Sequence, residues 1–543
     1  FSVDGHQETS RASARGAQRF FSKTVFFILI FFQVIILSSA LTGFFWLNSY
    51  FVLLFSLVSS FLIFKKFYFS EFVVPKKILL LSLLLVSLLA YPVLLLTPFF
   101  PASADPTTTG SVAFLGDKIP QDYQPYSPLN FGYQIGFPLL VNAFSDIFTF
   151  LPVYLWSWLL SLVSGALQLF GVYFVAREFF KSEKAAEFAS LLFFGTKLVY
   201  ENFYVGEYAW LLATGLMLFT LYFAAKKSGM QYLLFPVILV LHPAIAFNAL
   251  IFFAIAWLFY PGYFELPKIF ASAVFALPAF FANYSPIIFN VLFGAGLSSW
   301  EPGRGLLYYA QLLPTWIGFA VFFVFAVSFA YLALQKFSFT REQKMFGVLF
   351  ASGTLLYLLF GFFGVMLAGK AVELALLGVL FLAASFLEKI RLPDTSRFKL
   401  ALLVFCLVFF FTSSILTHYR GGSKITLEEA TFAADFREFD PELSRTLFLA
   451  PYSYKIAEFS NKVPFDLTGH YLSDVKLLYY SQEEYARFKG LPKITQSIVD
   501  TLCDECIDGL DVKYVVVKNG YYGKTLDYPV AFSTRGFVVY RKT

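Results

Sequence analysis

The sequence predicts an all-α polytopic membrane domain followed by a small α/β domain, and three observations lead to this fold class. The chain has 543 residues, of which 58% are hydrophobic, and its mean hydropathy is +0.69. Charged residues make up 14% of the chain, against about 25% in a typical soluble domain. Apolar runs of membrane-spanning length repeat along most of the sequence. These features exclude a soluble cytosolic enzyme and a disordered chain.

The distribution of charge divides the chain into domains. Residues 417–543 hold 33 charged residues in 127 positions, whereas residues 1–416 hold only 43. The density of charged residues in 417–543 is that of an ordinary soluble domain. We therefore predict a membrane domain over 24–416 and a soluble α/β domain over 417–543, which is long enough to bury a small core.

Residues 1–23 form a basic segment ahead of the first apolar run. Arg11, Arg15, Arg19 and Lys23 recur every four residues, so on a helix they share one face. Such a face suits a helix that lies on anionic lipid headgroups, or an ordinary cytoplasmic flank of the first span.

About thirteen apolar segments are predicted to cross the membrane as helices, because unpaired backbone groups are not tolerated in hydrocarbon. Segment 231–241 is short and ends at His242, so a half-depth or broken helix is the alternative there. The other segments lie near 24–41, 49–64, 78–97, 152–176, 186–200, 207–225, 244–260, 268–290, 313–335, 345–366, 370–388 and 399–416.

The loops between these segments predict the orientation. Of the 25 basic residues in 1–416, alternation of the loops places 21 on one side, together with the N-terminus. The positive-inside rule makes this side cytoplasmic. An odd number of crossings then places the C-terminal domain outside, in an integral protein of the cytoplasmic membrane. The basic residues on the outer side are Lys118, Lys197, Arg304 and Lys370.

The longest predicted outer loop, 98–151, contains many polar residues, so candidate functional groups gather at the outer face. Asp105 lies just beyond the end of a span, and a Pro/Tyr-rich stretch follows over 117–126. The loop ends in an apolar segment, 136–150, that suits a short interfacial helix.

This layout resembles that of the GT-C superfamily, polytopic glycosyltransferases that use lipid-phosphate-linked sugars outside the cytoplasmic membrane. Three further features are similar to those of archaeal and bacterial members described as membrane proteins related to 6-pyruvoyl-tetrahydropterin synthase. They are the turn 201–208 before a span, the sequence Leu-His-Pro at 241–243, and the strand-like runs 510–517 and 536–541. The Trp-Trp-Asp-Tyr-Gly motif of oligosaccharyltransferases is missing, which argues against that branch.

The resemblance implies a membrane glycosyltransferase of the cell envelope. It would move a sugar from a polyprenyl-phosphate donor to a lipid, glycan or protein acceptor at the outer face. One alternative is a non-catalytic GT-C-like scaffold with protein partners in an envelope complex, which the lack of the paired acidic motif common in the first loop favours. The other is a lipid or solute transporter, which would need a polar path through the membrane, and few charges lie within spans.

Transfer of a glycosyl group to a hydroxyl needs a base for the acceptor. Asp105 is the first candidate because of its place in the loop, and the alternative is an aspartate that caps a turn before Pro106. Asp117, Asp122 and Glu207 are secondary acidic candidates. A divalent cation, Mg or Mn, stays an open possibility, with Asp105 as its ligand.

The leaving phosphate needs a cation, and the outer side offers few. Arg304 suits bidentate contacts with phosphate oxygens, and an ion pair with Glu301 is its alternative. His242 could bind phosphate or relay a proton, or it could cap a broken helix before Pro243.

Two lysines complete the candidates for donor phosphate binding. Lys197 lies four residues before Glu201, and Lys370 lies three residues before Glu373. An ion pair on the surface of a helix is the alternative for each lysine.

The C-terminal domain shows no obvious catalytic set. Cys503 and Cys506 form a Cys-x-x-Cys pair, which outside the cytoplasm predicts a disulfide. No basic nucleic-acid surface is evident, so nucleic acid is not expected as a partner. Strands are predicted at 446–450, 476–480, 513–517 and 537–540, and helices at 482–489 and 494–503.

Overall fold

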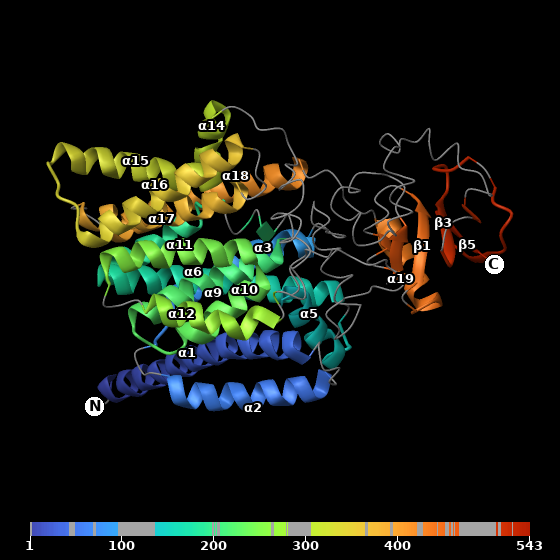
Figure 1. Ribbon diagram of the computed structural model, residues 1–543, viewed down its shortest axis with the longest axis horizontal. Helices are drawn as coiled ribbons and strands as arrows, with labels where there is room; N and C mark the ends of the chain where they lie inside the picture. Colours follow the sequence, from blue (N-terminus) through green and yellow to red (C-terminus); the bar gives the residue numbers. More distant parts are fainter. Residues whose placement is uncertain are drawn as a thin grey trace.

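A computed structural model shows a helical bundle and a small sheet (Figure 1). The structure describes residues 3–42, 49–68, 72–95, 136–151, 153–197, 200, 202–203, 207–261, 265–278, 280, 306–363, 368–390, 395–420, 427–442, 444–450, 456–457, 460, 462–465, 507–508, 512–523 and 525–542.

The bundle consists of fifteen described α-helices and one short 3-10 helix. The elements are α1 (Val3–Thr42), α2 (Ser49–Phe67), α3 (Lys76–Leu95), α5 (Gly136–Ile147), α6 (Val153–Phe180), α7 (Glu183–Phe193), α9 (Tyr208–Ala225), α10 (Gln231–Leu241), α11 (Pro243–Phe259), α12 (Leu266–Ser272), η1 (Ala273–Ala276), α14 (Leu306–Ile317), α15 (Phe319–Leu334), α16 (Arg341–Phe362), α17 (Ala368–Lys389) and α18 (Thr395–Arg420).

Seven helices among the described residues are long and apolar enough to cross a membrane. One further crossing is available if α14 and α15 act together. The predicted count of about thirteen crossings is therefore not confirmed. The segment predicted at 186–200 folds as α7, whose 11 residues span only about 16 Å at 1.5 Å per residue, about half of the hydrocarbon thickness.

The segment predicted as one span at 313–335 is divided between two helices, so a continuous helix there is not confirmed. Helices α14 and α15 meet at Gly318 with a bend of 97°. Gly318 has φ +105°, and a Cβ there would lie 2.3 Å from the carbonyl oxygen of Gly195. Only glycine fits this conformation and this approach, so the turn after α7 packs directly against the break.

Helix α9 lies at the centre of the bundle, since all its residues are buried. Most residues of α17 are also buried, whereas α2 and α18 expose large apolar side chains along their length. In a water-soluble protein, exposed apolar surfaces of this kind would promote aggregation. In a bilayer they are the faces that contact lipid, as the composition predicts.

The C-terminal domain combines one helix with a five-stranded sheet. Helix α19 (Leu427–Phe439) precedes strands β1 (Ser444–Leu449), β2 (Lys462–Phe465), β3 (Tyr514–Lys518), β4 (Val530–Ser533) and β5 (Phe537–Arg541), which are ordered β2-β1-β3-β5-β4. β1 pairs in parallel with β2 and β3, and β5 pairs antiparallel with β3 and β4. The predicted α/β class is confirmed. The predicted strand 476–480, both predicted helices, Cys503 and Cys506 lie outside the described residues.

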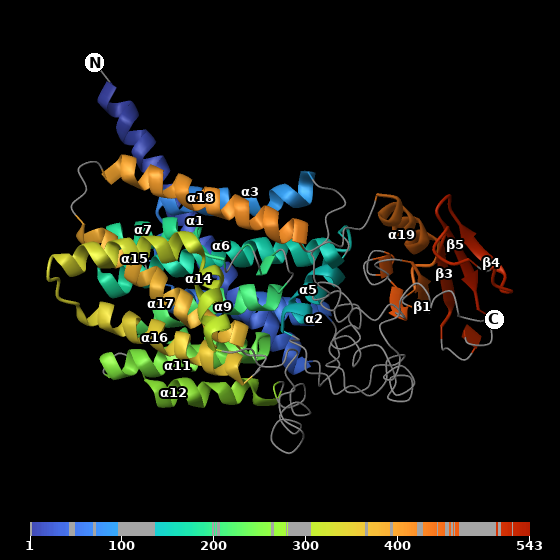
Figure 2. The same cartoon turned by 90° about the horizontal axis from the view of Figure 1, so that it is seen from above.

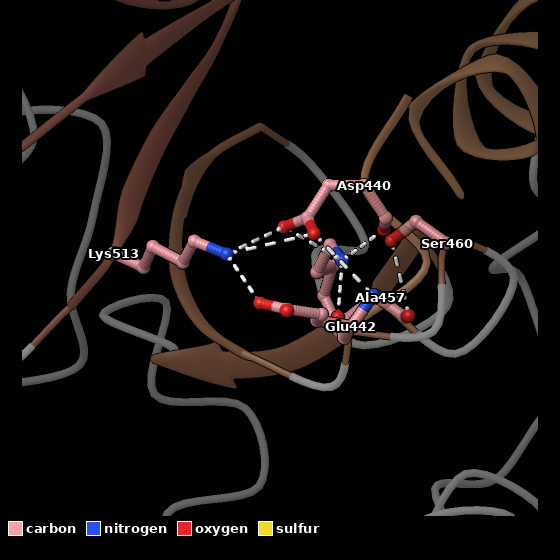
Figure 3. Close-up of polar contacts among 6 residues, drawn as sticks. Asp440, Glu442, Ala457, Ser460 and Lys513 are labelled. Carbon is pink, nitrogen blue, oxygen red and sulfur yellow. Dashed lines mark hydrogen bonds and ion pairs between the residues drawn. The ribbon is translucent and has the colours of Figure 1, made fainter. Parts of the chain in front are cut away.

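Aromatic packing and a buried lysine hold this domain together. The rings of Phe432 and Phe537 stack with centroids 4.1 Å apart, which joins α19 to β5. Lys462 is fully buried; its ammonium donates to the carbonyl oxygens of Asp440, at 2.5 Å, and Glu442, and lies 3.2 Å from the Asp440 carboxylate. Lys513 contacts the carboxylates of Asp440 and Glu442 at 3.3 and 2.9 Å (Figure 3). The network therefore ties the end of α19 to β2 and β3.

The sheet lies beyond one end of the bundle, and α1 begins at the opposite end (Figures 1 and 2). Helix α1 runs without a break through the basic segment 1–23 from Val3, and α18 continues to Arg420, past the predicted boundary at 416. The sidedness of the membrane stays a prediction.

Candidate functional site

Charged and aromatic side chains from three parts of the bundle meet around Trp210 of α9. Glu207 immediately precedes α9, Lys370 lies in the first turn of α17, and His242 joins α10 to α11. The Lys370 ammonium forms an ion pair with the Glu207 carboxylate and lies 3.5 Å from the centroid of the Trp210 ring. The His242 ring lies 6.2 Å from the Trp210 ring. We call these four residues the Trp210 corner.

A buried carboxylate fixes the start of α17 beneath this corner. Glu373 is fully buried, and it accepts hydrogen bonds from the Thr214 hydroxyl of α9 and, at 3.3 Å, from the Asn248 amide of α11. The Asn248 amide also donates to the Lys370 carbonyl oxygen at 2.8 Å. These bonds connect three helices and orient the first turn of α17, so that Lys370 projects toward Trp210.

The alternative ion pair between Lys370 and Glu373 is wrong. Within the described part of the chain, Glu207 is the carboxylate that pairs with Lys370, and Glu373 is engaged by neutral donors. An ionisable group deep in a membrane domain is costly unless it is hydrogen-bonded in this way. Glu373 therefore joins α17 to α9 and α11 through hydrogen bonds, and Glu207 is the carboxylate that forms the ion pair with Lys370.

Exposure separates the ion pair of the corner from His242 and from Glu373, which lies next to the corner. His242 and Glu373 are only 2% and 0% exposed, whereas the side chains of Lys370 and Glu207 are 16% and 27% exposed. The ion pair therefore lies at the rim of the corner, where an incoming anion can reach it. The buried residues beneath it are suited to holding its geometry.

The predicted outer loop leads into the same corner. Gly136 is the first residue of α5, and a Cβ there would lie 2.9 Å from the Cα of Leu241, the residue before His242. Only glycine allows this approach. The ring of Phe137 lies 5.8 Å from that of Tyr208, which follows Glu207. The start of α5 therefore lies against the residue before His242 and the residue after Glu207.

The structure brings together three of the predicted site residues, namely Lys370, His242 and Glu207. Lys197 is placed at a different feature, because its ammonium lies 4.1 Å from the Trp316 ring and its amide donates to the Ile317 carbonyl oxygen at the end of α14. The remaining candidates lie outside the described residues; they are Asp105, Asp117, Asp122 and Arg304.

Trp210, Thr214, Asn248 and Glu373 were missed as members of the site. The sequence carried a signal for two of them, since Trp210 and Thr214 follow Glu207 by three and seven residues and share its helix face. Asn248 is a polar residue within the apolar run of α11. Its partners Lys370 and Glu373, both on α17, are distant in sequence, so its role could be seen only in the fold.

The described residues hold no group of three or more His, Cys, Asp or Glu arranged to bind a metal. Asp105, the predicted ligand, lies outside them. A divalent cation at this site therefore stays a prediction.

Comparisons with known proteins place this architecture. No protein-family model and no curated protein matches the sequence. The AglB oligosaccharyltransferase of Archaeoglobus fulgidus, solved with an inhibitory peptide and a dolichol-phosphate, is 14% identical over 82% of this chain and 69% of its own, with a TM-score of 0.40. That score is too low to carry an argument.

A second solved structure is more informative. ArnT from Cupriavidus metallidurans, in the apo state, aligns with a TM-score of 0.51 and 13% identity over 81% of this chain and 93% of its own. At this identity the likeness shows the fold alone. The fold agrees with the polytopic helical membrane domain that the sequence predicted. This chain is an integral membrane protein with a polytopic helical fold like that of ArnT.

Proposed function

We propose that this protein is a glycosyltransferase that takes a sugar from a polyprenyl-phosphate-linked donor. The acceptor is a lipid, glycan or protein at the outer face, with the N-terminus in the cytoplasm and the C-terminal domain outside. The observation that carries the proposal is the Trp210 corner. In this corner Lys370 lies at the rim and α5 begins against Leu241, the residue before His242, within a fold like that of ArnT.

In this proposal the acceptor hydroxyl oxygen attacks the anomeric carbon of the sugar, and the bond from that carbon to the phosphate oxygen breaks. Asp105 takes the acceptor proton or holds a divalent cation, Mg or Mn, beside the phosphate. Lys370 stabilises the negative charge that develops on the leaving phosphate. Arg304 and His242 are further candidates for contact with the same phosphate, whereas Lys197 lies at Trp316 and would meet a phosphate only there. Asp117 and Asp122 are secondary candidates for the role of Asp105.

One observation favours a non-catalytic scaffold as the second candidate. The charge of Lys370 is already compensated by Glu207 and its ammonium lies against an indole face. A scaffold would keep this arrangement as a permanent connection between α9 and α17, whereas a transferase must open it to phosphate.

The test is the lipid that co-purifies with the full-length protein in mild detergent, identified by mass spectrometry. We expect a polyprenyl phosphate or its glycosylated form in the wild type and in Asp105→Ala. We expect its loss in Lys370→Met and in Arg304→Ala. Lys268→Met is the matched control, because this exposed lysine of α12 pairs with Glu265 at the start of that helix, outside the Trp210 corner. Bulk phospholipid alone in every sample would contradict the transferase and favour the scaffold.

A further inference from the structure

The ion pair at the rim of the Trp210 corner occupies the cation that a phosphate needs. Lys370 and Glu207 come from two helices, and their positions in the sequence are 163 residues apart. Both side chains are partly exposed. Because both side chains reach the surface, another anion can approach the ammonium, so this pair can be exchanged for a stronger anion.

The surroundings hold Lys370 in place while its partner changes. Its backbone carbonyl accepts the Asn248 hydrogen bond, and its ammonium lies 3.5 Å from the Trp210 ring centroid. The attraction between a cation and an indole face is independent of which anion occupies the other side of the cation. The lysine therefore keeps its position without Glu207.

The N-terminus of α9 offers a second favourable position for the Glu207 carboxylate. It is the residue before α9, its backbone is not helical (φ −75°, ψ 61°), and its side chain makes no capping hydrogen bond to the described first turn. The first amide groups of a helix lack partners within the helix, and a carboxylate is favoured near them. A carboxylate that leaves Lys370 can therefore be stabilised by the N-terminus of its own helix.

We propose that Glu207 is an exchangeable counter-ion, which the phosphate of the lipid-linked donor displaces from Lys370 and which reclaims Lys370 when the lipid phosphate leaves. The inference rests on the proposed function and adds a positioning residue to it. Cleavage of the glycosyl–phosphate bond leaves a phosphate monoester, which carries about −1.5 to −2 charges at neutral pH. Glu207 competes with this anion and thereby limits its retention.

The test uses farnesyl phosphate, an isoprenoid phosphate monoester, titrated into the full-length protein in detergent. Trp210 reports on the exchange, because an anion at Lys370 changes the field at the indole. Its contribution is the difference in tryptophan emission between the wild type and Trp210→Phe. We expect a saturable change that is absent in Lys370→Met and restored in part in Lys370→Arg.

The decisive variant is Glu207→Gln, which removes the competing charge and keeps the shape. We expect the Kd for farnesyl phosphate to fall about fivefold, which corresponds to the loss of a competing ion pair of about 1 kcal/mol. Glu265→Gln is the matched control, since that carboxylate, at the residue before α12, pairs with Lys268 of α12. The Kd of this variant should equal that of the wild type.

Two further ligands identify the source of the phosphate. Farnesol should give no change in the Trp210 signal, and inorganic phosphate should need a much higher concentration than farnesyl phosphate. An equal response to inorganic phosphate would overturn the assignment to a lipid donor. Unchanged or weaker binding in Glu207→Gln, or no response in any folded variant, would overturn the exchange.

The titration with farnesyl phosphate and the co-purification experiment can fail independently. Polyprenyl phosphate recovered from the wild type, together with weaker binding in Glu207→Gln, would keep the transferase and reject the exchange. The opposite combination would keep an exchangeable phosphate site and reject the polyprenyl donor.

Discussion

Each domain of this protein contains a lysine beside acidic groups, and the two lysines are held in different ways. In the C-terminal domain, the Lys462 ammonium contacts two backbone carbonyl oxygens and one carboxylate, and its side chain is fully buried. An ammonium has three donors, so protein atoms saturate it. In the bundle, Lys370 has one carboxylate partner among the described residues, an indole face and access to the surface.

This difference separates a lysine with a structural role, Lys462, from a lysine that can bind a ligand, Lys370. Backbone carbonyl groups cannot leave Lys462 without unfolding the segment that carries them. A glutamate side chain can leave Lys370 by rotation alone. A lysine that is satisfied by backbone is therefore structural, and a lysine that is satisfied by a mobile side chain is open to exchange.

The largest effect is expected from Lys462→Met. The substitution leaves the Asp440 carboxylate and two carbonyl groups without their buried donor, and breaking a buried pair costs about 3–5 kcal/mol. Hydrogen exchange of the full-length protein should show lost protection over β1 and β2, with the bundle unchanged. Full protection in this variant would break the comparison, because Lys462 would then be dispensable.

A smaller effect is expected from Asn248→Leu beneath the Trp210 corner. The variant removes the hydrogen bonds to Glu373 and to the Lys370 carbonyl oxygen. Interhelical hydrogen bonds in membrane domains contribute about 0.6–2 kcal/mol. Thermal unfolding in detergent should begin at a lower temperature, whereas Phe247→Leu, at a neighbouring exposed position, should match the wild type. Equal stability of the two variants would show that Asn248 does not hold α17.

The pH dependence of the C-terminal domain sharpens the contrast further. Burial alone raises the pKa of Asp440, but the ammonium groups of Lys462 and Lys513 outweigh burial and hold the pKa below its ordinary value of 3.8. A carboxyl group of this kind stabilises the fold above its unfolded pKa, and this contribution is lost as the pH falls through the folded pKa. Protection of β1 amides, corrected for intrinsic exchange, should therefore decrease below about pH 3.8.

Asp440→Asn provides the control for that titration. It should be less stable than the wild type at neutral pH and should lose less protection over the same acid interval. A parallel loss in both proteins would assign the pH dependence to other carboxyl groups of the domain.

The smallest effect is expected from Lys513→Met. This side chain is 33% exposed and contacts the carboxylates of Asp440 and Glu442. Exposed ion pairs contribute about 0.2–1 kcal/mol and are screened by salt. The loss of protection in the variant should be small and should shrink as salt is added. A loss as large as that of Lys462→Met would show that exposure does not separate the two lysines.

Much of the fold could be predicted because hydropathy and charge density are local properties of the sequence. The membrane domain, the strands near 446–450, 513–517 and 537–540, and the shortness of segment 231–241 all follow from them. The crossings were less predictable. α7 is apolar but short, and Gly318 breaks a continuous apolar run because of its contact with Gly195, which the linear pattern does not reveal.

The sequence by itself determined which charges are available at the predicted outer side, and Lys370, His242 and Glu207 were named on that basis. Only the tertiary structure decided which of them meet. Lys370 pairs with Glu207 across 163 positions rather than with Glu373 three residues away. The physical reason is that helix packing, and not sequence spacing, sets the distance between side chains on different helices. Glu373 is directed instead to Thr214 and Asn248 in the interior of the bundle.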